Sequence, residues 1–492
     1  MLNFQKRIIA RLDIKGSRLI KGIRFEGLRV LGNPCDAALS YYLQGIDEIF
    51  YSDAVASLYS RNGLDQLLKD TCKSVFVPIT AGGGIKSLED VYLLLKAGAD
   101  KIAINTNAVK NPDLITKLAN RFGEQCIVLS IQARRSEKLP SGWEVMIEAG
   151  RERTGIDLKS WIENSQKLGV GEILLTSVDK DGTNKGPDEE LIYMANKLMK
   201  KPLIVGGGFN SIASINKALS FDSVSGVSLG SALHYKKLTI EKIKIDINSK
   251  KVPLRVNLIN KFNFEKDQSL RRNIAVVDYG MGNQQSLINA LNLLGHNVIL
   301  SKNKNVIKDI ELVFLPGVGS FPAGIKELND RGLLKILIER YKNKRPIIGI
   351  CLGMQLLFES SSEFSHNIGL GIFKGNIKNI NDFNSVKSMN MKYNKEIKLP
   401  HMGWNNLSKS LGNSEFSKFD EFISQSFYFV HSYGAESIHN FDFCMKTNYF
   451  GREIVAICAS KKNVGFQFHP ERSGVIGLKF LSKIINHICS KP

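Results

Sequence analysis

The residues with the clearest chemical potential surround Cys351. Residues 345–355 read RPIIGICLGMQ, in which apolar residues lead into Gly349-Ile350-Cys351-Leu352-Gly353 and a helical pattern, MQLLFES, follows. This is the spacing of a nucleophile elbow, with cysteine in place of serine, and its small residues tolerate a sharp strand-to-helix turn. The N-terminus of the next helix favours the thiolate, the reactive form of cysteine. An isolated cysteine is more often a buried structural residue, but this spacing predicts a nucleophile at Cys351.

A thiolate nucleophile needs a base and a group that orients the base. Residues 465–472 read GFQFHPER, and His469 and Glu471 are two positions apart, so we expect both side chains on the same side of an extended strand end. His469 would exchange a proton with Cys351, and Glu471 would fix the imidazole tautomer. Residues 315–320 read LPGVGS, a Gly-rich loop whose backbone N–H groups, with that of Leu352, can stabilise an oxyanion.

A second kind of chemistry is indicated by two glycine triplets, at residues 82–84 and 206–208. Each follows an apolar run, and the two occupy matching places in two halves of the first 235 residues. Backbone N–H groups approach an anion closely where side chains are absent. One triplet alone is more often a tight turn, but two at matching positions favour phosphate binding. We therefore expect a ligand with a phosphate at both ends.

The elements that must position these residues are short apolar runs that alternate with helical patterns such as residues 87–97 and 112–122. Eight such runs predict a (β/α)8 barrel over residues 1–256, whereas an open doubly wound sheet would use fewer strands. The polar, basic residues 257–272 are interpreted as a linker, and a new strand at 273–278 opens a second α/β domain over residues 273–492. The eight runs are Arg7–Ile14, Glu48–Ala54, Val77–Gly84, Lys101–Asn105, Cys126–Ala133, Glu172–Val178, Pro202–Gly208 and Gly226–Ala232.

The composition narrows the class of protein. The chain has 492 residues, 43% of them hydrophobic, and a net charge of +20, which excludes a disordered chain, a coiled coil and a collagen-like repeat. The charge leaves nucleic acid, anionic membranes and phosphorylated small molecules open as partners. No helix-turn-helix or aromatic-interleaved basic motif supports nucleic acid, and no run of about 18 apolar residues or signal-like N-terminus supports a membrane. Seven scattered cysteines without a C-x-x-C pair argue against a disulfide framework and a zinc site. We expect a cytoplasmic protein without metal or cofactor.

The second domain resembles the class I glutamine amidotransferases, above all the glutaminase subunit of imidazole glycerol phosphate synthase. The resemblance is carried, in order, by PGVGSF, GICLGMQLLFE, LPHMGWN, YFVHSY and GFQFHPE. It implies that Cys351, His469 and Glu471 form the triad that hydrolyses glutamine. It further implies that Gln355 helps to bind glutamine and that a mobile oxyanion strand contains Gly317 and Val318.

Residues 1–256 resemble the cyclase subunit of the same synthase through RIIARLDIKG, KGIRFEGLR, AGGGIKS, GADKIAINT, GEILLTSVDKDGT and GVSLGSALHY. The resemblance implies that Asp13 is a catalytic acid and that a ring of four charged residues forms an ammonia gate. The gate residues are Arg7, Glu48, Lys101 and Glu172. The implied phosphate-binding residues are Lys21, Gly83, Asn105, Thr106, Asp181, Gly182, Gly208, Gly230 and Ser231.

The barrel departs from the family pattern at one position. The family places a carboxylate at the end of the fifth strand, where this chain reads Ser130-Ile131-Gln132-Ala133-Arg134. An amide cannot take up a proton at pH 7, and losing a general acid or base typically costs on the order of 10²–10⁴ in rate. Gln132 therefore leaves the cyclase step open.

Three interpretations follow. In the first, ammonia converts N'-phosphoribulosyl-formimino aminoimidazole carboxamide ribonucleotide (PRFAR) to imidazole glycerol phosphate and AICAR in histidine biosynthesis, with a water or another group replacing the carboxylate. In the second, the barrel is not a cyclase, and the chain supplies ammonia to a separate amidotransferase that acts on an N-acetyl sugar of surface polysaccharide. In the third, the chain is a silent scaffold that binds a bisphosphate, which leaves the predicted triad unexplained.

Overall fold

The computed structural model describes residues 4–54, 64–249, 252–255, 271–384, 397–412, 414–436 and 441–489. The chain divides into two compact units, one formed mainly by Gln5–Lys261 and one mainly by Phe262–Ile397 and His401–Pro492. Of the predicted linker, residues 257–270 lie outside the described part of the chain. Within the described ranges, no helix is long and apolar enough to cross a membrane.

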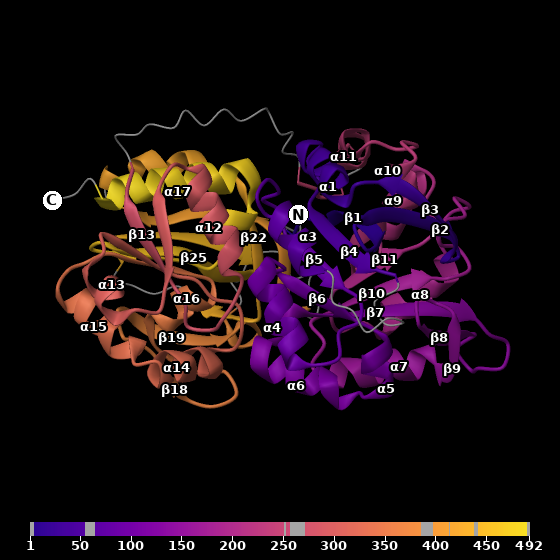
Figure 1. The fold of residues 1–492 in the computed structure, drawn as a ribbon, viewed down its shortest axis with the longest axis horizontal. Helices are drawn as coiled ribbons and strands as arrows, with labels where there is room; N and C mark the ends of the chain where they lie inside the picture. Colours follow the sequence, from indigo (N-terminus) through magenta and orange to yellow (C-terminus); the bar gives the residue numbers. More distant parts are fainter. Residues whose placement is uncertain are drawn as a thin grey trace. The chain divides into compact units, whose positions relative to one another are not determined.

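The first unit is a closed barrel of eight parallel strands (Figure 1). Pairing runs from one strand to the next, and the ring is closed where β7 pairs with β10 and β12 pairs with β1. This confirms the predicted (β/α)8 fold. The strands are β1 (Arg7–Lys15), β4 (Glu48–Asp53), β5 (Ile79–Gly82), β6 (Lys101–Ile104), β7 (Ile127–Arg135), β10 (Glu172–Ser177), β11 (Leu203–Gly206) and β12 (Val224–Leu229).

Inward-facing side chains such as Ile9, Phe50 and Leu174 fill the interior of the barrel, so it is a packed core. Helices follow the strands and pack outside them with one apolar face each. They are α1 (Pro34–Leu43), α3 (Leu64–Thr71), α4 (Leu88–Ala97), α6 (Asp113–Phe122), α7 (Leu158–Lys167), α8 (Glu189–Leu198), α9 (Ile212–Leu219) and α11 (Ile240–Asn248).

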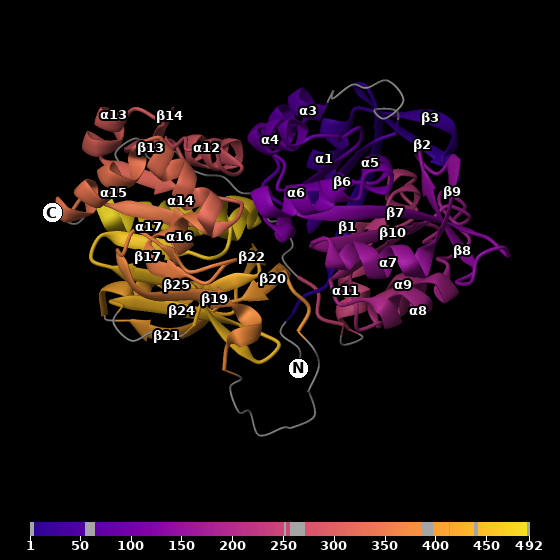
Figure 2. The same cartoon turned by 90° about the horizontal axis from the view of Figure 1, so that it is seen from below.

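The two halves of the barrel share a structural feature beyond the glycine triplets. β1 continues into the antiparallel strands β2 (Arg18–Ile23) and β3 (Glu26–Gly32), and β7 continues into β8 (Trp143–Ile147) and β9 (Glu152–Asp157). Figure 2 shows both extensions at the same end of the barrel. This end carries the carboxyl termini of the strands, where barrel enzymes place their active sites.

The second unit is built on a mixed sheet whose first five strands are mutually parallel. Figure 1 shows α12 (Gln284–Leu293) and α17 (Gly474–Cys489) over one face, and α13 (Lys304–Asp309), α14 (Phe321–Asp330) and α15 (Leu333–Lys342) over the other. In sheet order the strands are β14 (Asn297–Ser301), β13 (Asn273–Val277), β15 (Leu312–Leu315), β16 (Ile347–Ile350), β26 (Asn463–Phe466), β25 (Arg452–Ser460), β24 (Phe443–Tyr449) and β21 (Ser408–Gly412).

Two predictions of local structure were wrong in extent. The strands before the glycine triplets end at Gly82 and Gly206, because Gly83 (φ +129°) and Gly207 (φ +97°) turn the backbone out of the extended conformation. The helical pattern after Cys351 was expected to reach Ser360, but α16 covers only Leu352–Leu356. Strand β17 (Phe358–Ser361) follows at once, because it pairs with β19 (Phe373–Asn379), a contact that local periodicity does not reveal.

A buried carboxylate ties the end of the barrel sequence to its first strand. One Asp47 oxygen accepts hydrogen bonds from Lys244 Nζ (2.5 Å) and Arg255 Nε (2.8 Å), and the other accepts one from the Ile8 N–H (2.8 Å). Asp47→Asn leaves two buried cations without their counter-charge, so the free energy of unfolding should fall by about 3–5 kcal/mol. Urea denaturation, monitored by tryptophan fluorescence, measures the change in the free energy of unfolding.

Asp65→Asn is the matched control for Asp47→Asn. Asp65 pairs with Lys69 at 3.8 Å on the exposed surface of α3, where an ion pair contributes about 0–1 kcal/mol. Equal destabilisation by the two substitutions would show that the Asp47 cluster does not hold the barrel together.

Candidate active sites

Cys351 stands at a strained turn between β16 and α16. Its backbone has φ +52° and ψ −110°, a conformation that residues other than glycine rarely adopt. The flanking glycines are needed for this turn, because a Cβ on Gly353 would lie 1.8 Å from the Leu315 carbonyl oxygen and one on Gly349 would lie 2.7 Å from the Gly353 oxygen. Strain of this kind is typical of functional residues that the surrounding structure holds in place.

His469 and Glu471 are in direct contact, with 2.7 Å between Nδ1 and Oε1. The expected extended strand end was wrong, because Pro470–Arg472 forms a 3₁₀ turn and His469 caps it. The turn is fixed by the His469 N–H, which donates to the Tyr428 carbonyl at 2.9 Å. The parallel pairing of β16 with β26 brings this turn and the Cys351 elbow to the same edge of the sheet.

The electrostatics of His469 suit a base beside a thiol. Burial lowers its pKa, but Glu471 and Cys351 together outweigh burial and raise the pKa well above its usual value. The Cys351 side chain lies close enough to contribute to this shift, and the buried Nε2 atom has no other hydrogen-bond partner among the described residues. The ring is therefore oriented through Nδ1 and able to accept or return a proton through Nε2.

His431 is the other histidine near this site, and its contacts differ. Its Nδ1 contacts the Tyr433 carbonyl oxygen at 2.7 Å and its Nε2 contacts His401 Nδ1 at 3.1 Å, so both ring nitrogens are engaged. Burial lowers the pKa of His431 to about 4. A neutral imidazole with both nitrogens occupied is poorly suited to proton transfer, so the contacts of His431 are not those expected of a catalytic base.

The predicted oxyanion donor is occupied in this structure. The Leu352 N–H donates to the Gly317 carbonyl oxygen at 3.3 Å, so the peptide of the Gly-rich loop points its oxygen where an oxyanion would bind. Tyr279, which sequence reasoning missed, holds this loop from behind, because its buried hydroxyl donates to the Pro316 carbonyl at 2.6 Å. The neighbouring residue Val318 is buried.

Gln355 is connected to Cys351 through Gln467, a residue that the sequence analysis did not identify. Its Nε2 donates to the Tyr433 carbonyl (2.8 Å) and to Gln467 Oε1 (3.1 Å), and Gln467 Nε2 is 3.7 Å from Cys351 Sγ. Gln467 lies inside the GFQFHPE segment, two residues before His469, and that proximity was the available signal. A polar chain therefore connects the predicted glutamine-binding residue to the reactive sulfur.

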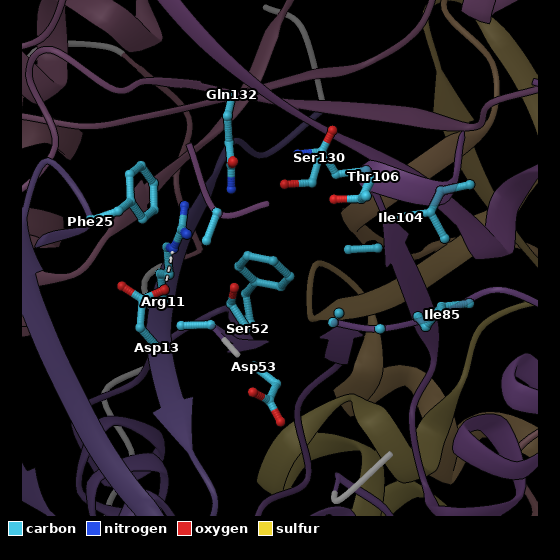
Figure 3. Close-up of a pocket in the computed structure, with 18 of the residues that line it drawn as sticks. Arg11, Asp13, Phe25, Ser52, Asp53, Ile85, Ile104, Thr106, Ser130 and Gln132 are labelled. Carbon is cyan, nitrogen blue, oxygen red and sulfur yellow. Dashed lines mark hydrogen bonds and ion pairs between the residues drawn. The ribbon is translucent and has the colours of Figure 1, made fainter. Parts of the chain in front are cut away.

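The barrel carries a cavity at the carboxyl ends of its strands. Its lining includes Asp13, Gln132, Gly83, Asn105 and Thr106. Figure 3 shows the Gln132 amide extending into this space. Gln132 is only 7% exposed, and its Oε1 has no hydrogen-bond partner among the described residues. We call this space the upper cavity.

The phosphate-binding residues predicted in the second half of the barrel do not line the upper cavity. Asp181, Gly208, Gly230 and Ser231 line a second cavity, with about 300 Å³ of empty space. Gly182 packs against the β2 segment, since a Cβ there would lie 2.3 Å from the Gly22 carbonyl oxygen. The two predicted groups thus correspond to two separate spaces.

Both oxygens of Asp13 are held by cations. Oδ1 accepts from Arg11 Nε and Oδ2 accepts from Lys21 Nζ, each at 2.8 Å, and Lys21 Nζ also donates to Asp181 at 2.8 Å. Burial raises the pKa of Asp13, but Arg11 and Lys21 outweigh it and hold the pKa far below its usual range. Lys21, expected at a phosphate, is here engaged by two carboxylates. Arg11 was not predicted as a site residue.

Four charges close the opposite end of the barrel, and we call them the lower ring. Arg7 contacts Glu48 (2.9 Å) and Glu172, and Lys101 contacts the same two carboxylates at 2.7 and 2.8 Å. Each is the first residue of its strand, and all four are buried. Above them is a small space lined mostly by apolar side chains such as Ile9 and Leu174. The predicted gate residues therefore form one connected network.

Comparison with known proteins identifies both units. The family model of histidine biosynthesis proteins matches residues 7–239, and that of class-I glutamine amidotransferases matches residues 275–483. The imidazole glycerol phosphate synthase subunit HisF of Legionella pneumophila is 54% identical over 210 residues, which is 43% of this chain and 98% of that protein. The chain belongs to the imidazole glycerol phosphate synthase family.

Other HisF relatives extend the match over the whole barrel. The HisF subunit from a strain of Prochlorococcus marinus is 44% identical over 249 residues, covering 51% of this chain and 97% of the subunit. The Clostridium botulinum subunit is 42% identical over 251 residues, covering 51% of this chain and 99% of the subunit. This synthase-family chain is thus an enzyme that joins a HisF-like barrel to a glutamine amidotransferase domain.

Within the described residues, no group of three or more His, Cys, Asp or Glu side chains is placed to hold a metal ion.

The contact between Tyr279 and Pro316 leads to a prediction about basal activity. Tyr279→Phe removes one buried hydrogen bond, about 1 kcal/mol, that favours the conformation in which Gly317 covers the Leu352 N–H. Glutamine hydrolysis without barrel ligand should rise about 5-fold, measured as glutamate release. Tyr341→Phe, on α15, is the control and should have no effect. An unchanged or lower rate in Tyr279→Phe would show that its hydroxyl does not hold the loop closed.

Proposed function

We propose that this enzyme hydrolyses glutamine at Cys351, His469 and Glu471 and passes the ammonia through the barrel to an acceptor. The observation that carries the proposal is the His469–Glu471 contact of 2.7 Å beside a strained elbow cysteine. A merely structural histidine would not need an orienting carboxylate on one nitrogen and an open, buried second nitrogen.

The mechanism follows from these contacts. His469 takes the thiol proton of Cys351, and the sulfur attacks the carboxamide carbon of glutamine. His469 then passes this proton to the departing nitrogen, which leaves as ammonia, and a thioester to glutamate remains. In the second half, His469 takes a proton from water while the water oxygen attacks the thioester, and it returns that proton to the departing sulfur as glutamate is released. Both tetrahedral intermediates carry an oxyanion, which the Leu352 N–H can stabilise once the Gly317 carbonyl has turned away.

The interior of the barrel supports a route for ammonia. The small apolar space above the lower ring and the upper cavity share Phe50 in their linings, so they are neighbours along the barrel axis. Neutral ammonia can cross an apolar space that an ammonium ion cannot enter without a large desolvation cost. The lower ring has to part for passage, because each of its four charges contacts two others.

Two acceptors are consistent with this route. The first is PRFAR, which the family's cyclase reaction converts to imidazole glycerol phosphate and AICAR in histidine biosynthesis. Two separate cavities with glycine turns suit a ligand with two phosphates. Cyclisation needs groups that give and take protons, and Gln132 supplies an amide in their place.

The second candidate is that the barrel binds a phosphorylated ligand but is not a cyclase. The chain would then supply ammonia to an amidotransferase that acts on an N-acetyl sugar in surface polysaccharide biosynthesis. The buried Gln132 amide, directed into the upper cavity with an unpartnered oxygen, favours this candidate. Such an amide can hydrogen-bond a ligand but cannot transfer its proton at neutral pH. Neither candidate requires a cofactor.

Cys351→Ala tests the glutaminase. Without the sulfur no thioester can form, so glutamate release should fall to background, a loss of about 10⁴-fold or more. Cys35→Ala, a partly exposed cysteine on α1, is the matched control and should keep full activity. Residual glutaminase activity in Cys351→Ala above a hundredth of the wild-type rate would rule out Cys351 as the nucleophile.

The acceptor is tested by supplying PRFAR with an ammonium salt to the full chain. We expect imidazole glycerol phosphate to form at least about 10²-fold more slowly than glutamine is hydrolysed by the same preparation, because a proton-transfer group is missing. The assay follows AICAR release and product by chromatography. Formation at ordinary enzymatic rates would establish the cyclase candidate and exclude the second one.

A further inference from the structure

Arg11 occupies a position that neither the glutaminase nor the phosphate sites explain. It extends inward from β1, two residues before Asp13, and among the described residues it alone lines both the upper cavity and the second cavity. Its guanidinium is 5.2 Å from the Phe25 ring centre and 5.6 Å from that of Phe50. Arg11 is only 4% exposed. A cation so deeply buried is held there by specific contacts.

Those contacts fix the guanidinium against the carboxylate that the cyclase reaction would use. Arg11 Nε donates to Asp13 Oδ1 at 2.8 Å, and its NH1 donates to Thr176 Oγ1, on β10, at 3.2 Å. Lys21 occupies the other Asp13 oxygen. Figure 3 shows the Arg11–Asp13 contact at the margin of the cavity into which Gln132 extends.

We propose that Arg11 is a second obstacle to proton transfer in the barrel, independent of Gln132, because it holds Asp13 ionised and stands between the two phosphate-binding spaces. The inference rests on the second candidate of the proposed function, the barrel that is not a cyclase. A carboxylate with a cation on each oxygen is a poor acid, because it carries no proton, and a poor base, because protonation would break two charged hydrogen bonds. The low pKa of Asp13 has the same cause.

The position of Arg11 also affects a ligand directly. A ligand that reaches both phosphate-binding spaces has to pass the guanidinium, since Arg11 is the residue their linings share. The central atoms of such a ligand are those that react in a cyclisation. Gln132→Asp restores the missing carboxylate. It would leave Asp13 paired with Arg11 and Lys21, and the Arg11 guanidinium would still stand between the two cavities.

The experiment compares cyclisation of PRFAR with ammonium by the full chain, by Gln132→Asp, by Arg11→Ala and by the double variant Arg11→Ala/Gln132→Asp. We expect each single variant to remain within about 10-fold of the wild-type rate and the double variant to gain about 10²-fold or more, because both obstacles have to be removed. Circular dichroism and thermal melting report whether each variant is folded. Arg11→Met, which keeps the bulk without the charge, replaces Arg11→Ala if the alanine variant does not fold.

The matched control is Arg11→Lys/Gln132→Asp. A lysine retains a cation near Asp13, so this variant should stay at the level of Gln132→Asp. A gain of activity that depends on removing the cation cannot come from a purely structural role of Arg11, because losing a structural contact lowers activity.

Three results would overturn the inference. Gln132→Asp alone could match the double variant, which would show that Arg11 is no obstacle. The double variant could show no gain while folded, which would place the limitation elsewhere. The lysine control could gain as much as the alanine variant, which would exclude the charge as the cause. Cyclisation by the wild-type chain at ordinary rates is a different outcome, because it refutes the proposed function itself.

Discussion

Pairing of buried charges is the constraint on which both ends of the barrel depend. An ionised side chain inside a protein is costly unless an opposite charge and hydrogen bonds compensate it. The lower ring satisfies this rule with two cations and two carboxylates, and so does the set of Arg11, Lys21, Asp13 and Asp181 at the other end. The same rule has opposite functional consequences. At the lower end it closes the passage that we propose for ammonia, whereas at the upper end it engages a carboxylate that a cyclase would need for catalysis.

The glutaminase unit uses a single charge contact for activation. Glu471 orients His469 and raises the pKa of the imidazole, so the ring holds a proton readily beside the Cys351 sulfur. The backbone around Leu352 is not arranged to bind an oxyanion, because the Leu352 N–H already donates a hydrogen bond to the Gly317 carbonyl oxygen. If Cys351, His469 and Glu471 act as proposed, hydrolysis of glutamine is limited by the backbone and not by the nucleophile. Ammonia release would then stay low until the Gly317 peptide turns.

Much of the architecture could be predicted because the signals are local. Short apolar runs that alternate with helical patterns marked the eight barrel strands, and the Gly-x-Cys-x-Gly spacing marked the elbow at Cys351. What failed depends on distant partners. Strand β17 replaces a predicted helix because it pairs with β19, and Tyr279 acts on Pro316 through a contact across 37 residues. Arg11 could have been noticed, since period-two alternation places it on the same inward face as Asp13, but its hold on that carboxylate is visible only in three dimensions.

The residues of the upper cavity argue together for a loss of cyclase chemistry more strongly than Gln132 does alone. A single amide in place of a carboxylate could be compensated by a water or a neighbouring acid. Here the neighbouring acid, Asp13, is itself held by Arg11 and Lys21, so the structure offers little compensation at that point. The glycine turns and the lower ring, for which we propose ligand binding and ammonia passage, do not depend on proton transfer. A barrel with an amide at residue 132 and with Asp13 held by two cations therefore fits the second candidate, in which a phosphorylated ligand binds and no imidazole ring is closed.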